Sequence, residues 1–241
     1  VAWVYALLPE FTGREWKTDK VLVYFWNATF LLILIAWFQN LYSDFVEPAS
    51  RHFSGQIINF LSAIPASIIT MFGVIVQFYH SKIKWSIIPL MFLFGIAGWA
   101  IAGFAATVES TIAVYKVLHN TMFVPAHLHT NMLMGVTLFI FAFLFYFFFE
   151  KSKEYGGKKA KVGFWLFVGG GYGFVFMFYL EGLSSIPRRY ARYTGIGIKS
   201  MHDTAVQQAQ IAVFFVVLLS IGLIIMYFSL LQTFLKRRVT E

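Results

Sequence analysis

Apolar residues form long stretches along this chain, and short polar loops separate them. Six stretches are long enough to cross a bilayer, which takes about 20 residues of α-helix. They are residues 21–41, 56–79, 85–108, 122–149, 162–183 and 206–235. Turn residues such as Thr12-Gly13 and Gly156-Gly157 mark the loops between them. The pattern predicts an all-α, polytopic transmembrane helical bundle with six complete spans.

The first eight residues are also apolar, but they are too few to cross a bilayer. No basic segment or small-residue cleavage site precedes them, which argues against a signal peptide. We interpret them as the end of a partial N-terminal span. Residues 1–241 are then expected to form a single transmembrane domain, and the chain to be part of something longer.

Composition excludes a soluble domain and several kinds of metal site. Of the 241 residues, 59% are hydrophobic and only 12% are charged, whereas soluble domains have about a quarter charged residues. Cysteine is absent, so disulfides, thiolate metal sites and iron–sulfur clusters are excluded. Any metal or cofactor must be held by nitrogen, oxygen or methionine sulfur.

The net charge of +8 is better explained by membrane topology than by nucleic-acid binding, because the basic residues lie at span ends. Thirteen of the 19 lysines and arginines fall on one side of the predicted bundle and six on the other. The positive-inside rule makes the richer side cytoplasmic and places the C-terminus inside. Four of the six outer cations share one loop, which topology alone does not explain: Arg188, Arg189, Arg192 and Lys199.

Histidines at the outer end of the fifth span are the clearest candidates for chemistry, because ionisable residues in a membrane are costly. His119 and Asn120 precede the pair His127 and His129. Two helical residues subtend about 200°, so the paired histidines point in nearly opposite directions and cannot chelate one ion together. Each can bind a different cofactor, and imidazole is a common axial ligand of heme iron. The alternative is that they bond to neighbouring helices or line a proton path.

Residues 118–129 resemble the tenth-helix motif of heme-copper oxidase subunit I, in the form of the B-type branch. The resemblance implies that His127 ligates the iron of the active-site heme. It implies that His129 ligates the iron of a second, electron-transferring heme. His119, with Asn120 beside it, would lie near the heme propionates and the proton exit region.

A second, independent segment carries the same resemblance. Residues 182–190, which include Pro187, Arg188 and Arg189, resemble the Pro-Arg-Arg-Tyr segment after the eleventh helix of that family. There the two arginines hold heme propionates, and guanidinium groups suit paired carboxylates. The alternative is that they lie at lipid headgroups. With Ile64-Pro65, similar to the kinked eighth helix, the resemblance covers helices seven to twelve and the end of six, half of a twelve-helix bundle.

The chain departs from the family at the copper ligands. Gln39 and Asn40 stand where the family has a His-His pair, and side-chain amides are poor copper ligands. Ile69 stands where the family keeps a polar residue for proton uptake, with Ser67 and Thr70 beside it. We therefore expect two hemes, of a or b type, and no ordinary copper site.

Two functions from different classes follow. The first is a heme-binding redox subunit of a membrane respiratory complex that resembles a terminal oxidase, an oxidoreductase that passes electrons to oxygen. The second is a degenerate, non-catalytic paralogue that binds heme or scaffolds a respiratory complex. Either would need partner membrane subunits, including an upstream segment that completes the bundle and an electron donor. We expect a prokaryotic cytoplasmic membrane as the location.

Two other motifs are interpreted as features of the helices and not as sites of chemistry. His202-Asp203 resembles another form of the first histidine motif but lacks a following pair, and we interpret it as a helix entrance. The run Gly169–Gly171 with Gly173 is expected to permit close helix packing or to leave room for a flat cofactor.

Overall fold

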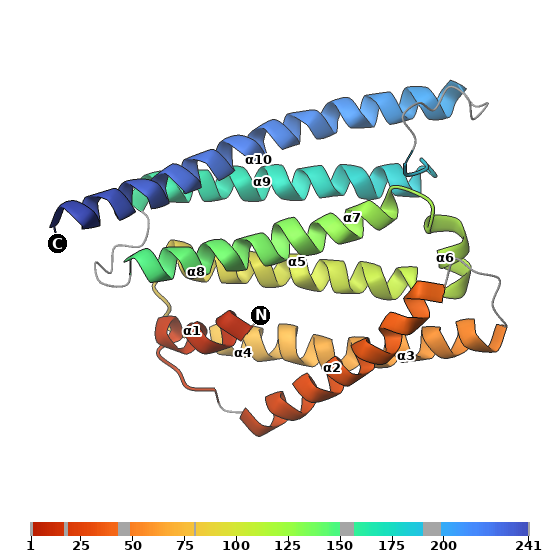
Figure 1. Ribbon diagram of the computed structural model, residues 1–241, viewed down its shortest axis with the longest axis horizontal. Coiled ribbons are helices and arrows are strands. Elements are labelled where there is room, and N and C mark those ends of the chain that lie inside the picture. Colours follow the sequence, from red (N-terminus) through yellow and green to blue (C-terminus); the bar gives the residue numbers. More distant parts are fainter. Residues whose placement is uncertain are drawn as a thin grey trace. The chain divides into compact units, whose positions relative to one another are not determined.

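The computed structural model of this chain is built of helices (Figure 1). It describes residues 2–16, 19–42, 49–79, 81–149, 157–189 and 199–240. The elements run in the order α1 (Ala2–Thr12), α2 (Asp19–Tyr42), α3 (Ala49–Ser67), η1 (Ile68–Gly73), α4 (Val74–Phe78), α5 (Ile87–Glu109), α6 (Ile112–Leu118), α7 (Phe123–His129), η2 (Thr130–Thr137), α8 (Leu138–Phe149), α9 (Gly157–Leu183) and α10 (Lys199–Thr240). The only β-pairing within these ranges is an isolated bridge between Thr121 and Pro187.

The predicted spans are confirmed as helices. Within the part of the chain that the structure describes, five stretches are long and apolar enough to cross a membrane: Phe53–Phe78, Ile87–Glu109, Phe123–Phe148, Gly157–Leu183 and Met201–Gln232. The first predicted span, 21–41, lies within α2, a helix of 24 residues. Many large apolar side chains on these helices are exposed, as expected of surfaces that face lipid. The all-α, polytopic architecture follows directly from the hydrophobic pattern.

Two spans contain a segment of π-helix, a feature that the hydrophobic pattern does not predict. The first, η1, follows the proline Pro65 inside α3. Proline removes one backbone hydrogen bond and crowds the preceding turn, so the helix around it must adjust. The second, η2, begins immediately after His129. π-Helical insertions are frequent at functional sites because they redirect the side chains that follow.

The chain forms two compact units, one of residues 1–84 and 100–119 and the other of residues 85–99 and 120–241. In the first unit, α1 is tied to the span α3–η1–α4. The Tyr5 hydroxyl donates to the carbonyl of Ile69, and the Gln77 amide donates to the Thr12 hydroxyl at 3.0 Å. The Gln56 side chain accepts from the backbone amide of Ile112, the first residue of α6, at 2.9 Å.

In the second unit, α9 and α10 lie side by side and run antiparallel (Figure 1). Glycines set how closely they approach. A Cβ atom on Gly170 would lie 2.7 Å from the carbonyl oxygen of Phe215 and 2.8 Å from Cα of Leu219. A Cβ atom on Gly222 would lie 2.6 Å from the carbonyl oxygen of Gly163. Small residues therefore let the two backbones touch, as is common between membrane helices.

Two alanine substitutions in the run Gly169–Gly171 test this packing, one at a contact and one as its control. Gly170→Ala should destabilise the protein by about 1–3 kcal/mol, because its new methyl group meets backbone atoms that no rotamer change can move. Gly169→Ala is the control, since a Cβ there would meet no heavy atom of the described residues within 4 Å, and it should be neutral or stabilising by up to ~1 kcal/mol. Thermal unfolding of the purified protein in detergent measures both. Equal melting temperatures would contradict the packing role.

The same principle brings α5 against the histidine-bearing span. A Cβ atom on Gly98 would lie 2.6 Å from Cβ of Met134 and 2.8 Å from its carbonyl oxygen. One turn earlier on α5, the carbonyl oxygen of Phe94 accepts a hydrogen bond from the Tyr172 hydroxyl of α9 at 2.8 Å. The first half of α5, η2 and α9 therefore form a closely packed core within the second unit.

Candidate functional site

The histidine pair lies on α7, a helix that begins at Phe123 with Met122 as its N-cap. Pro125 occupies the first turn, where its missing N–H costs nothing because first-turn amides have no partner within the helix. Ala126 is fully buried and Phe123 is 7% exposed, whereas His127 and His129 are half-buried. The buried face of α7 packs on α9, and the Phe123 ring lies 5.0 Å from that of Tyr179.

His129 is held in one orientation by a backbone hydrogen bond. Its Nδ1 lies 2.7 Å from the carbonyl oxygen of Pro125. A carbonyl can only accept, so this bond assigns the proton to Nδ1 and leaves the lone pair on Nε2. Metal-ligating histidines are commonly oriented by such a bond from the other ring nitrogen. The Nε2 atom of His129 is therefore prepared to bind a metal ion.

Two neighbouring aromatic rings of α9 lie against one side of the same histidine. The centroids of Phe174 and Phe178 lie 6.0 and 5.6 Å from the His129 ring, with interplanar angles of 83° and 76°. The two phenylalanines are four residues apart, so they share a helix face. Neither phenylalanine was predicted as a site residue, although their spacing of four is visible in the sequence. Their rings place apolar aromatic surface beside the imidazole.

His127 lies two residues before His129 on the same α-helix, so their side chains leave α7 in nearly opposite directions. Within the described ranges, no three histidine, cysteine, aspartate or glutamate side chains gather where they could hold a metal ion. The backbone thus presents two separate imidazoles and no multi-residue chelate among those residues. Whether each binds an iron remains a prediction.

The turn after His129 changes the helical pitch. The Thr130 hydroxyl donates to the carbonyl oxygen of Ala126 at 2.7 Å, and its oxygen lies 3.3 Å from the Tyr179 hydroxyl, within hydrogen-bond distance. Further along η2, the Thr137 hydroxyl donates to the carbonyl of Met132, five residues back, at 2.9 Å. Hydroxyl groups thus bond to carbonyls within the π segment. Thr130 and Tyr179 are further residues of the site that the sequence analysis missed.

The segment after α9 that carries Arg188 and Arg189, called the arginine loop below, begins where two backbone hydrogen bonds end the helix. The amide of Ile186 donates to the carbonyl of Glu181 at 3.0 Å, and the amide of Ser185 donates to that of Gly182 at 3.1 Å. These two bonds form a Schellman motif, whose residue in the left-handed conformation is usually glycine. Here it is Ser185, with φ of 60°. Ile186 is 1% exposed, so the loop turns back into the protein instead of leaving it.

The histidine and arginine segments meet directly. The amide of Met122 donates to the carbonyl of Ile186, and the amide of Arg188 donates to the carbonyl of Asn120, each at 2.9 Å. These bonds flank the bridge between Thr121 and Pro187. Two motifs more than 60 residues apart in the sequence therefore form one short paired structure at the N-terminal end of α7 and the C-terminal end of α9.

A glycine permits this approach. A Cβ atom on Gly182 would lie 2.6 Å from both Cα and Cβ of Phe123. The last turn of α9 and the first turn of α7 are thus in backbone contact. The start of the helix that carries His127 and His129 is located by the end of the helix that leads to the arginines.

Arg188 and Arg189 differ in burial and in backbone conformation. Arg188 is half-buried, and its backbone amide is used in the pairing with Asn120. Arg189 is exposed and has φ of 70°, a left-handed conformation that costs a non-glycine residue about 1 kcal/mol or more. Such strain in a loop is a reason to suspect function. Asn120 is exposed and contributes its carbonyl, not its side chain, to the junction.

His119 belongs to the first unit, at the C-cap of α6. Its ring lies 4.2 Å from that of Tyr115, centroid to centroid, and its Nε2 is 3.1 Å from the Tyr115 hydroxyl. The tyrosine holds this histidine through contacts local to α6.

Three further sequence predictions concern the copper position at Gln39 and Asn40, the residue Ile69, and the glycine run. The side chains of Gln39 and Asn40 lie outside the described residues, so the copper position stays a prediction. Ile69 is fully buried, and its carbonyl accepts from Tyr5. In the glycine run, Gly170 and Gly173 pack against α10 and Gly171 against Met134, so that run serves helix packing.

The chain is similar to known proteins over most of its length. The family described as cytochrome C and quinol oxidase polypeptide I matches residues 1–225. A curated relative, cytochrome c oxidase polypeptide 1 of Halobacterium salinarum, is 26% identical over 194 residues, which are 79% of this chain and 32% of the relative. A solved structure of a heme-copper terminal oxidase dimer is similar with a TM-score of 0.67 and 23% identity, covering 81% of this chain and 38% of the other. That likeness concerns the fold alone, and the chain spans about a third of the length of these relatives.

Proposed function

Because the chain belongs to the family of cytochrome c and quinol oxidase polypeptide I, we propose that it is a heme-binding redox subunit of a membrane respiratory complex. The observation that carries the proposal is the orientation of His129 by the Pro125 carbonyl, which leaves Nε2 available to iron. When bound, heme supplies one-electron redox chemistry that no side chain of this protein offers. The protein supplies ligands, orientation and electrostatics.

Each candidate residue has a separate part in this proposal. His127 and His129 are the axial ligands of two different hemes, since they leave the helix in opposite directions. Arg188 and Arg189 bind heme propionates at the outer end of the spans, where Asn120 anchors their loop to the histidine segment. His119, held by Tyr115, belongs with the propionate region. Phe174 and Phe178 exclude water from the His129 ligand.

Partner polypeptides complete the proposal. The chain spans about a third of its curated relative, and a low-spin heme held by His129 needs a second axial ligand besides that histidine. We therefore expect an upstream segment or separate subunit to supply that ligand, and a further subunit to donate electrons. A prokaryotic cytoplasmic membrane remains the expected location.

A second candidate function is a non-catalytic paralogue that binds heme or scaffolds a respiratory complex. It is favoured by Gln39 and Asn40, whose amide groups suit neither cuprous nor cupric ion. The intact histidine and arginine motifs favour heme binding in both candidates, so the second metal and oxygen consumption distinguish a catalytic subunit from a heme-binding paralogue, and heme content identifies a pure scaffold.

A reduced-minus-oxidised optical spectrum with metal analysis tests both candidates on the purified complex. We expect two hemes per chain, no stoichiometric copper, and slow or absent oxygen consumption. One copper for each pair of hemes together with rapid oxygen consumption would contradict the expectation for Gln39 and Asn40. A preparation without heme would refute the redox function and favour a pure scaffold.

Replacing Arg188 with leucine tests the propionate role. The change removes a charge-assisted hydrogen bond worth about 1.5–3 kcal/mol. A positive charge stabilises the reduced heme, so its loss should lower the midpoint potential of the nearby heme. Arg188→Lys should restore only part of the shift, because the planar fork geometry is lost. Potentiometric titration of the two variants measures the effect, and unchanged potentials in both would assign the arginine to lipid headgroups.

A further inference from the structure

A pocket of about 430 Å³ lies between the first turns of α9 and the C-terminal half of α10, at the other end of α9 from the arginine loop. It is far from the histidine pair along α9, and the proposed heme chemistry does not use it. Its lining comes from both helices: Lys158, Lys159, Val162, Ile224, Ile225, Phe228, Ser229 and Gln232. Its volume is in the range of small-molecule sites.

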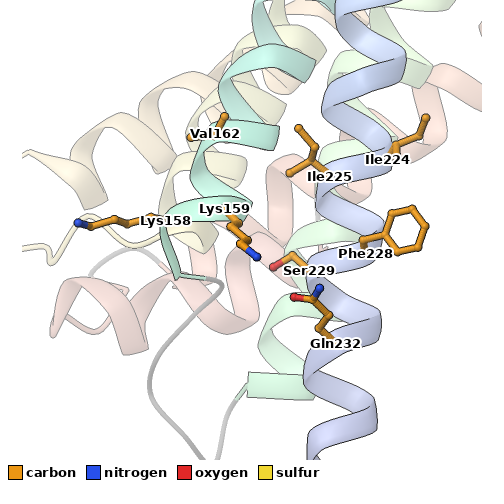
Figure 2. A pocket seen from close by; sticks show the side chains of 8 residues that line it. All are labelled: Lys158, Lys159, Val162, Ile224, Ile225, Phe228, Ser229 and Gln232. Carbon is orange, nitrogen blue, oxygen red and sulfur yellow. The ribbon is translucent and has the colours of Figure 1, made fainter.

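The lining changes character along the membrane normal. Lys158 and Lys159 precede Val162 by about one helical turn, or ~5 Å. Because α10 runs antiparallel, Ser229 and Gln232 lie at the lysine end and the isoleucines lie deeper. Figure 2 shows the Lys159 side chain pointing toward Ser229, with Ile225 between the two helices, while Lys158 extends away from α10. The pocket therefore has a cationic, hydrogen-bonding end and an apolar end.

The apolar end is exposed at the surface of α9 and α10. Val162 is 54% exposed, and Ile224 and Phe228 are each 53% exposed. Just above the pocket, Gly163 and Gly222 bring the helices into backbone contact. The close contact closes the pocket on that side, and the apolar side chains form a wall along which an acyl chain can lie.

We propose that this pocket binds one anionic glycerophospholipid of the surrounding leaflet. Lys159 binds the phosphate, Lys158 adds positive charge at the same end of α9, Ser229 and Gln232 donate to phosphate or glycerol oxygens, and the acyl chains lie along Ile225 and Phe228. The charge of the lysines selects an anionic headgroup, since a cationic end beside an apolar wall matches a phosphate joined to acyl chains. A free phosphate ion would use the lysines but not the apolar wall.

The test uses the purified complex that contains this chain, titrated with phosphatidylglycerol or phosphatidylcholine and weighed by native mass spectrometry. We expect preferential retention of one phosphatidylglycerol. Lys159→Ala should weaken that retention on the order of fivefold, and Lys158→Ala plus Lys159→Ala on the order of 25-fold. Lys82→Ala plus Lys84→Ala is the matched control, because it removes two exposed lysines outside the pocket, and it should change nothing.

Three further arms identify the occupant. Ile225→Trp fills the apolar end and should weaken retention although both lysines remain. Excess inorganic phosphate should not displace the lipid. p-Benzoylphenylalanine in place of Phe228 should form a photo-adduct with the mass of a phospholipid. A polypeptide adduct, displacement by phosphate, or equal retention in all variants would overturn the proposal.

Discussion

Replacing His129 with leucine should remove one of two hemes from the purified complex and leave the other in place. Leucine keeps the volume of the side chain and its apolar contacts with Phe174 and Phe178, but it offers no lone pair to iron. His127→Leu should remove the other heme, because the two imidazoles leave α7 in opposite directions. Pyridine hemochrome assays count the hemes, and low-temperature spectra identify which one is lost.

His202→Leu is the control for this experiment. His202 is a half-buried histidine on α10, in the same unit, with no part in the proposed heme site. It should leave the heme content and the spectrum unchanged. If the His127 and His129 variants both retain two hemes, the histidines only bond to protein, and the redox function of this chain fails.

Gly182→Ala should lower the heme content as well as the stability, although the residue is expected to touch no cofactor. Its methyl group would lie 2.6 Å from Cα of Phe123, so the first turn of α7 must shift away from α9. Overpacking of this kind costs about 1–3 kcal/mol. The shift would also strain the bonds of Met122 to Ile186 and of Arg188 to Asn120, and with them the orientation of both histidines and the arginine loop.

The matched comparison is again Gly169→Ala on the same helix, where the added methyl group meets no described atom within 4 Å. Thermal unfolding and heme content should be measured together on both variants. A Gly182→Ala protein that loses stability but keeps full heme content and unchanged potentials would show that the junction only stabilises the fold. Unchanged stability would contradict the backbone contact itself.

The details of the candidate site could be predicted from the sequence only in part. The helical angle between His127 and His129 is a local property, and the resemblance of residues 118–129 and 182–190 to one family pointed to both halves of the site. The Schellman motif at Ser185 was hidden, because the sequence there lacks the glycine that usually marks it. The π-helical turn after His129 was hidden too, because apolar patterning does not distinguish a π-helix from an α-helix.

The membrane spans were determined by the sequence alone. A stretch of about 20 apolar residues must satisfy its backbone hydrogen bonds internally once in the bilayer, so hydropathy by itself dictates a helix. Tertiary structure decided which groups those helices bring together. The bond between His129 and the Pro125 carbonyl is local to α7, whereas the two amide bonds that join the histidine and arginine segments and the contact of Gly182 with Phe123 depend on chain positions far apart. Such contacts arise only when whole helices have packed, because the same apolar surface would allow many other arrangements.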